Sequence, residues 1–317
     1  MHYRVTDLGT LPGYSDSVAS GINDQGWVVG SAYTPGDYES SHAFVWHDGS
    51  MTALNAPDCI SSSASAINNH NQIVGSASKQ KTEHDAVLWQ NEEMLNLGTL
   101  GGDQAYAYAI NDQGQVVGSS ADHKGHSNFR AFLWQDGKMH QLPVNGSDSN
   151  ARGINNEGQS VGLMNWADRF ATAFRCQQER WEELTPPIYA SWTADAINDS
   201  GDIVGSFETD PEDWTPSHAC LWHNGKAEDL GALPGYSECE ATAINNSGEI
   251  VGTAQEGQTR RALLWQQKQL IDLNDLLPVD SGWTLERATA INSKGQIAGE
   301  GLHDGHRRAF LLTPANR

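Results

Sequence analysis

The chain has 317 residues, and its 40 acidic against 19 basic side chains give a formal charge of −21 at pH 7. Nucleic-acid binding depends on cationic contacts to phosphate, so this balance argues against a DNA or RNA partner. No run of 18 apolar residues occurs, which excludes a transmembrane helix. The acidity favours cationic or basic partners, or a solvated surface with no partner.

The N-terminal segment, residues 3–11, reads directly as a strand, without the basic and apolar regions of a signal peptide. We expect a cytoplasmic protein as the sequence stands, or an extracellular one if a leader has been removed. Cys176 and Cys220 occupy apolar repeat positions, while Cys59 and Cys239 fall in expected loops. This predicts four free thiols.

One motif, Ala-x-(Ala/Gly)-Ile-Asn, recurs at intervals of 43 to 47 residues along the chain. Its asparagines are Asn23, Asn68, Asn111, Asn155, Asn198, Asn245 and Asn292. Each begins an Asn-x-x-Gly segment, with Asn71 replacing the glycine in the second copy. Because Asn bonds its own backbone and Gly adopts positive φ, the segment predicts a hairpin turn. A short apolar strand ending in Gly follows each turn.

A second hairpin completes each repeat. Its first strand is apolar, as in His42-Ala43-Phe44-Val45-Trp46, and a further turn leads to a fourth strand. Four antiparallel strands in about 45 residues predict an all-β, seven-bladed β-propeller. We expect the recurring strand tryptophans in its core: Trp46, Trp89, Trp134, Trp222 and Trp265.

The last repeat has only three strands before the chain ends. Residues 3–11 match the fourth strand of the second repeat, residues 94–100, so we expect the N-terminal strand to complete the last blade and close the ring. The whole chain, residues 1–317, is then a single propeller domain.

His42-Ala43-Phe44, together with Asp7-Leu8-Gly9-Thr10-Leu11 and the Ala-Ile-Asn-x-x-Gly motif, resembles the HAF repeat family of bacterial proteins. The resemblance covers residues 1–314. It implies a repeat protein that is generally extracellular, and it brings no established activity or catalytic residues.

Positions shared by all repeats serve the scaffold, so a single asymmetric site is expected where the repeats differ. On the inner strand, the positions two and four residues before the Ile carry six distinctive polar side chains: Tyr106, Tyr108, Arg152, Asp195, Glu240 and Arg287. By strand alternation both positions share the side opposite the fixed alanine. The six predict a pocket for a polar or zwitterionic ligand at the mouth of a central channel, unless they only pair with one another or with water.

Loop aromatics form a second candidate set: Tyr14, Tyr189, Trp192, Tyr236 and Trp283. Exposed aromatics beside polar groups suit peptide or sugar recognition, whereas packing over the blades is the competing interpretation.

The sequence gives little support for a metal site or for a catalytic site. His123/His126 and His303/His306 each supply two ligands with one nearby acid, Asp122 or Asp304, which is a weak metal site. We predict no metal, no cofactor and no assigned catalytic residue. No nucleophile motif or phosphate-binding loop occurs in the sequence.

The leading hypothesis is a monomeric binding protein whose loop face holds a protein, a peptide or a carbohydrate. The alternative is a lyase or hydrolase with an acid–base site at the channel mouth, built on Asp195 or Glu240. A closed pocket with a carboxylate shielded from water would favour the enzyme. An open face with exposed Trp192 and Trp283 would favour binding. A lectin with one site per blade is a third possibility, which the diversity of the loops disfavours.

Overall fold

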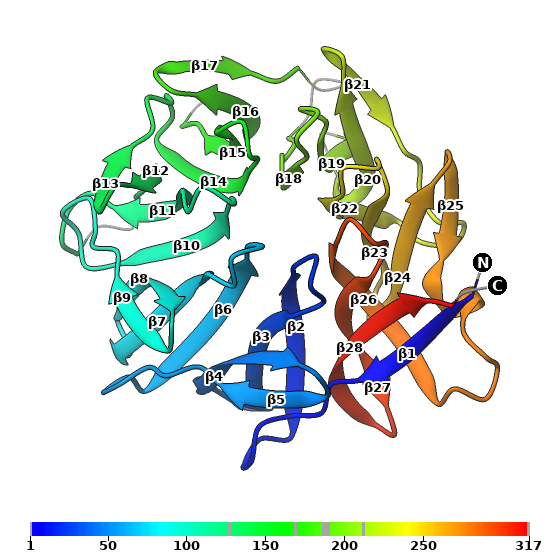
Figure 1. The fold of residues 1–317 in the computed structure, drawn as a ribbon. Coiled ribbons are helices and arrows are strands. Elements are labelled where there is room, and N and C mark those ends of the chain that lie inside the picture. The colour runs from blue at the N-terminus through cyan, green and yellow to red at the C-terminus, as the bar shows by residue number, and fades with distance from the viewer. Residues whose placement is uncertain (1, 126–127, 168–169, 186–190, 211–212, 316–317) are drawn as a thin grey trace.

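The computed structural model describes residues 2–125, 128–167, 170–185, 191–210 and 213–315. In this part of the chain all regular structure is β, apart from one short 3-10 helix, η1 (Leu273–Leu276). Antiparallel sheets of short strands are arranged around a common centre, like the blades of a propeller (Figure 1). The predicted all-β propeller of four-stranded sheets is confirmed at this level.

The sheets follow one another in chain order. The first holds β2 (Asp16–Ile22), β3 (Val28–Thr34), β4 (Asp37–His47) and β5 (Ser50–Ala53). The second holds β6 (Ser61–Ile67), β7 (Ile73–Gln80), β8 (Glu83–Gln90) and β9 (Glu93–Asn96). The third holds β10 (Ala105–Ile110), β11 (Val116–Ala121), β12 (Phe129–Gln135) and β13 (Lys138–Gln141). The fourth holds β14 (Asp148–Ile154), β15 (Gln159–Asn165), β16 (Thr172–Gln177) and β17 (Arg180–Glu183).

Two further groups of four strands share one eight-stranded sheet. The first group is β18 (Ala196–Ile197), β19 (Ile203–Asp210), β20 (Asp213–His223) and β21 (Lys226–Asp229). The second is β22 (Glu238–Ile244), β23 (Ile250–Glu256), β24 (Thr259–Gln266) and β25 (Gln269–Asp272). A single parallel pairing, Ser217 with Glu238, joins them.

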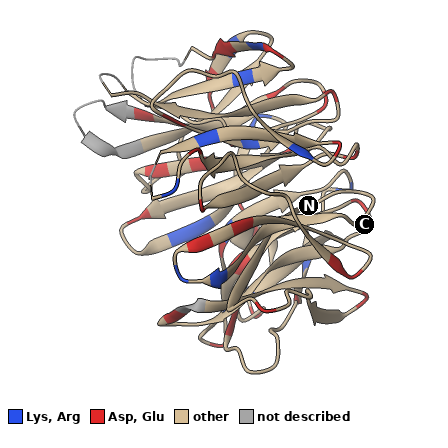
Figure 2. Ribbon diagram, turned by 90° about the vertical axis from the view of Figure 1, so that its left-hand side faces the viewer, with Lys and Arg blue, Asp and Glu red and all other residues tan. Residues whose placement is uncertain are grey.

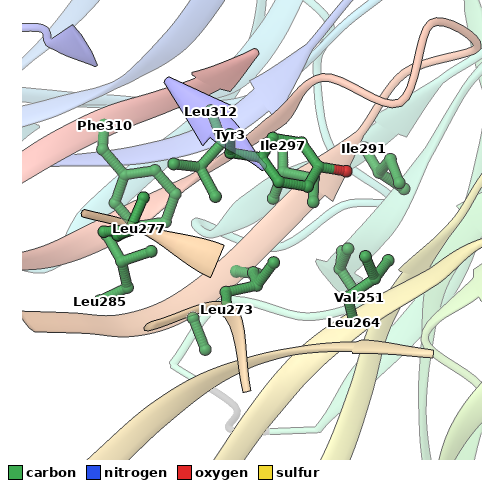
Figure 3. Packing of buried hydrophobic residues seen from close by; sticks show 12 residues of the cluster. Tyr3, Val251, Leu264, Leu273, Leu277, Leu285, Ile291, Ile297, Phe310 and Leu312 are labelled. Carbon is green, nitrogen blue, oxygen red and sulfur yellow. The ribbon is translucent and has the colours of Figure 1, made fainter. Parts of the chain in front are cut away.

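The last sheet combines both ends of the chain. It holds β26 (Trp283–Ile291), β27 (Ile297–His303), β28 (His306–Pro314) and β1 (Tyr3–Asp7). β1 pairs antiparallel with β28, with Tyr3 opposite Pro314 and Asp7 opposite Phe310. Tyr3 is only 3% exposed and packs in a cluster with Leu273, Leu285 and Phe310 (Figure 3). Burial, with the charge of Glu249, raises the pKa of the Tyr3 phenol to about 12.

The recurring glycine of the second strand has a steric cause. A Cβ built on Gly118 would lie 1.9 Å from the main-chain oxygen of Tyr106 on the inner strand, and one on Gly252 would lie 1.9 Å from that of Glu240. Only glycine permits this approach. The inner strand is irregular at the same level: the β10–β11 register shifts between Ala107 and Ala109.

The Asn-x-x-Gly turns hydrogen-bond to one another across the sheets. Asn23 Oδ1 accepts the backbone N–H groups of Gln25 and Trp27, and its Nδ2 donates to the Asn68 oxygen at 3.2 Å. The same link runs from each turn to the next: Asn68 to Asn111, Asn111 to Asn155, Asn155 to Asn198, Asn198 to Asn245, Asn245 to Asn292 and Asn292 to Asn23. All seven asparagines are buried, so these bonds form away from water.

The five strand tryptophans pack in hydrophobic clusters, as predicted: Trp46, Trp89, Trp134, Trp222 and Trp265. All four cysteines are free thiols. One expectation was wrong: Cys239 lies in β22, fully buried, and not in a loop. The segment before β22 is shorter than expected because the strand begins at Glu238.

Acidic residues are spread over many strands and loops (Figure 2). No helix among the described residues has the length and hydropathy needed to cross a bilayer.

Candidate functional site

The six polar residues that distinguish the inner strands are called the axial cluster here: Tyr106, Tyr108, Arg152, Asp195, Glu240 and Arg287. They come from β10, β14, the segment before β18, β22 and β26, the strands nearest the centre in Figure 1. The structure brings neighbouring members of the cluster into contact or electrostatic range.

Arg152 and Asp195 form an ion pair between the fourth sheet and the next. Asp195 also accepts a hydrogen bond from Thr193 Oγ1 at 2.6 Å. The Arg152 side chain remains 42% exposed and that of Asp195 20% exposed, so the pair is accessible from solvent.

Glu240 is a carboxylate of the axial cluster whose pKa is shifted by its surroundings. Desolvation by the surrounding protein, and then the negative charge of Asp195, raise its pKa above the usual 4.5. Arg287 and Arg152 oppose this shift. The residue is nevertheless exposed, so Glu240 lies against protein without being sealed from water.

The two tyrosines lie next to this charged group. Their rings are parallel, with centroids 6.4 Å apart, and the Tyr108 hydroxyl lies 3.0 Å from Ser119 Oγ. Burial raises the pKa of both phenols, and for Tyr108 the hydrogen bond with Ser119 and the charge of Arg152 oppose this rise. Tyr108 therefore links the aromatic part of the cluster to its charged part.

A β-bulge interrupts the regular strand alternation at two of these residues. In β14 the register shifts between Ala151 and Gly153, so Arg152 is the extra residue. Tyr108 occupies the equivalent bulge in β10. A bulge redirects a side chain relative to regular alternation, and the recurring Gly opposite a small-residue strand is the sequence signal that could have revealed it.

Trp192 requires a correction. It is 2% exposed, its Nε1 donates to the Leu184 oxygen at 3.1 Å, and it packs against Trp222. Its indole lies inside the core, so Trp192 is no exposed loop aromatic.

The other loop aromatics are partly buried. Trp283 was expected in a loop but is the first residue of β26, and it stacks on His303 with centroids 4.6 Å apart. The Tyr14 hydroxyl lies 2.6 Å from His42 Nδ1, and Tyr236 packs on the cluster around Cys239. These contacts place the three at separate sheets and not in one aromatic patch. Tyr189 lies outside the described residues.

Sequence reasoning missed a charged network in the last sheet. Arg307 lies 2.5 Å from Glu286 and 3.3 Å from Glu300, and both glutamate residues are buried. Although desolvation works in the opposite direction, Glu300 and Glu286 raise the pKa of Arg307. Glu300 also lies 3.5 Å from Arg287. The available signal was Glu300 itself, which replaces the Ser, Thr or Leu that follows this glycine in the other repeats.

No group of three or more potential metal ligands occurs within the described part of the chain. His303 lies 2.8 Å from Asp7, and His123 lies 2.8 Å from Asp122. His126 is outside the described residues. Within the described residues, His303 and His123 each contact a carboxylate without forming a group of three metal ligands.

A model of the family described as "Protein of unknown function (DUF3466)" matches residues 9–100 and 100–258. No curated protein matches the sequence. Among solved structures, the β-propeller domain of the Trilobed protease from Pyrococcus furiosus is similar with a TM-score of 0.61 and 8% identity, over 96% of this chain and 95% of that chain.

Two further structures are similar at the same level. YCF48 bound to D1 peptide has a TM-score of 0.60 and 10% identity, over 99% of this chain and 98% of that chain. A puromycin-hydrolyzing peptidase of Mycobacterium tuberculosis has a TM-score of 0.58 and 11% identity, over 94% of this chain and 49% of that chain. At these identities the similarity establishes the propeller fold alone.

Proposed function

The chain belongs to the family described as "Protein of unknown function (DUF3466)", and on that premise we propose that it is a binding protein whose axial cluster holds a charged segment of a peptide or protein. The proposal includes a ring of seven four-stranded blades, closed by the N-terminal strand within one domain of residues 1–317. The hydrogen bonds between turns, which run from the first repeat to the last and back, support this arrangement.

The convergence of charges carries the binding proposal. The negative charges of Asp195 and Glu238 act to raise the pKa of Glu240, and the positive charges of Arg287 and Arg152 act to lower it. A neutral sugar would desolvate these charges without compensating them, which is costly. A peptide segment with charged side chains can pair with them, so we favour a peptide over a carbohydrate. The similar structure of YCF48 bound to D1 peptide shares only the fold.

One observation favours an enzyme as the second candidate. The raised pKa of Glu240 is a property of general acids and bases. Its access to water and the absence of an adjacent nucleophile motif make acid–base catalysis the weaker proposal.

Peptide and glycan arrays, followed by calorimetry of the strongest ligand, test the proposal. We expect a charged peptide to bind, and Glu240→Gln or Arg152→Gln to weaken binding about tenfold or more, since hydrogen bonds to charged groups are among the stronger ones. Glu93→Gln, at an exposed position of β9, is the matched control and should leave the affinity unchanged. Binding of glycans only, or peptide binding unaffected by both cluster variants, would overturn the proposal. Turnover of the bound peptide that Glu240→Gln abolishes would support the enzyme.

A further inference from the structure

A cavity of about 190 Å³ lies between β22–β24 and β26 of the neighbouring sheet. It is lined by Glu238, Glu240, Thr253, Gln255, Arg260 and Arg287, all of them polar. Cross-strand register explains the grouping: Glu238 is opposite Gln255, and Glu240 is opposite Thr253. Arg260 is in turn opposite Gln255. Five of the six side chains thus belong to two adjacent rows of one sheet.

The charged groups of this pocket are poorly paired. Among the described residues, the carboxylates of Glu238 and Glu240 have no hydrogen bond or ion pair. Arg260 donates through Nε to Gln255 Oε1 at 2.8 Å. Arg287 lies 3.5 Å from Glu300 and acts on Glu240 through its charge. Positive and negative groups therefore border one cavity, and in the described part of the chain neither carboxylate has a direct ion pair there.

Thr253 gives a second, independent observation. The residue is 6% exposed, and its Oγ1 is buried without a hydrogen-bond partner. At the equivalent position of other repeats the hydroxyl is bonded: Ser31 to Ser63 at 2.9 Å, and Ser119 to Tyr108 at 3.0 Å. Because an unsatisfied buried hydroxyl is costly, a group entering the cavity gains by bonding it.

Charge balance selects the class of ligand. A divalent cation would be repelled by Arg260 and Arg287, and an anion by Glu238 and Glu240. A neutral polyol would leave all four charges uncompensated. The cavity is also smaller than the roughly 300 Å³ at which drug-sized pockets begin, so it suits a small molecule that carries both signs of charge.

We propose that this pocket binds one free α-amino acid. Its ammonium group lies against Glu238 and Glu240, its carboxylate lies against Arg260 and Arg287, and Thr253 hydrogen-bonds one of these groups. The inference rests on the proposed binding role of the axial cluster, with which the pocket shares Glu240 and Arg287.

The test is calorimetry of the full chain with each of the twenty L-α-amino acids at low ionic strength. The best ligand is then compared with its N-acetyl and its amide derivative, which each remove one charge. We expect at least one free amino acid to bind, and both derivatives to bind about tenfold or more weakly. Arg260→Gln and Glu238→Gln should cause similar losses. Ser76→Ala, the position equivalent to Thr253 in the second sheet, should cause none.

The outcomes separate this inference from the proposed function. If no amino acid binds at millimolar concentration, or if the N-acetyl and amide derivatives bind as well as the free form, the pocket assignment is wrong. Peptide binding that depends on Arg152 would then still support the proposed function. If a free amino acid binds as expected while no peptide does, the pocket stands and the proposed function fails. Unchanged thermal unfolding of Arg260→Gln and Glu238→Gln shows that a loss of binding is not a loss of folding.

Discussion

Asn292 Nδ2 donates a hydrogen bond of 2.9 Å to the main-chain oxygen of Asn23, which lies 269 residues earlier in the sequence. The bond joins the turn of the last repeat to the turn of the first. The pairing of β1 with β28 joins the same two ends of the chain at the outer edge of the last sheet. The turns therefore link the last repeat to the first, and β1 links the N-terminal end of the chain to the last sheet.

Removal of residues 1–8 tests the link at the edge. It eliminates the β1–β28 pairing and the buried side chain of Tyr3, and leaves β28 as an exposed edge. We expect a large fall in the urea midpoint. Tyr3→Ala alone should cost about 3 kcal/mol, and Tyr3→Phe, which removes only the 3.3 Å bond to the Gly295 oxygen, about 1 kcal/mol. An unchanged midpoint after truncation would show that β1 does not stabilise the last sheet.

The turn asparagines can be dissected with two substitutions at one position. Asn155 Oδ1 accepts two backbone N–H groups of its own turn, while Nδ2 donates to the Asn198 oxygen of the next turn. Asn155→Ala loses all of these bonds and should cost about 3 kcal/mol. Asn155→Asp keeps the acceptors and loses the bond between sheets, and its buried charge adds a penalty at neutral pH. Urea unfolding at pH 7 and pH 4 separates the two effects. Equal stability of Asn155→Asp at both pH values would contradict this assignment.

The residue after each turn asparagine follows a second pattern around the molecule. Acids and amides alternate at these positions: Asp24, Asn69, Asp112, Asn156, Asp199 and Asn246, with Ser293 completing the set. Asn69 donates to Asp24 at 3.2 Å and to Asp112 at 3.1 Å. Neighbouring carboxylates would repel each other, so an amide stands between them. Because seven is odd, strict alternation has to break once, and Ser293 stands at that break.

This alternation predicts a contrast between two chemically identical substitutions. Asn69→Asp places three carboxylates in succession and should lower the free energy of unfolding at pH 7 by about 1–3 kcal/mol. Asn246→Asp creates only one such neighbour, Asp199, and should cost less. Repulsion raises the pKa of the new carboxyl in the folded state, so the penalty should fall as the pH is lowered. Urea titrations at pH 7 and pH 4 would refute the idea if both variants lost the same stability.

Much of the fold was readable because it repeats. A hairpin turn that occurs seven times, with strand tryptophans at matching positions, leaves little freedom in the order of the strands. The predictions that failed were those that depended on tertiary structure. Cys239 was placed in a loop because the sequence does not show where β22 begins, and Trp192 was placed on the surface although its indole fills a gap beside Trp222.

The candidate site was predictable only in part. Departures from the repeat identified Arg152, Asp195, Glu240 and Arg287, and the structure places them within range of one another. Inner-strand analysis alone could not find Thr253 and Arg260, which belong to β23 and β24 and reach the same cavity through strand register. Contacts across a sheet depend on register, and the hydrophobic pattern of one strand does not specify them.

Thr253→Val is expected to stabilise the unliganded protein. The substitution replaces a buried hydroxyl that has no partner with a methyl group of similar shape, which should raise the free energy of unfolding by about 1 kcal/mol. Ser119→Ala, at the equivalent position, removes a hydroxyl bonded to Tyr108 and should have the opposite sign. Parallel urea curves for the two variants compare them directly. A loss of stability in Thr253→Val would mean that its hydroxyl is satisfied.

Glu240→Gln should change how stability depends on pH. Desolvation and the charge of Asp195 raise the pKa of Glu240 in the folded protein above the usual 4.5, so the folded state binds this proton more tightly than the unfolded state. The stability that the group contributes is therefore full below pH 4.5 and is lost as the pH rises through its folded pKa. The glutamine variant does not titrate, so its stability relative to the natural protein should increase from pH 4 upward and become constant once Glu240 is ionised. Glu93→Gln, in the exposed β9 strand, should run parallel to the natural protein over the same range. Urea unfolding in half-unit steps from pH 4 to pH 8 measures both differences, and a Glu240→Gln difference that stays constant with pH would show that the carboxylate is not destabilised by its surroundings.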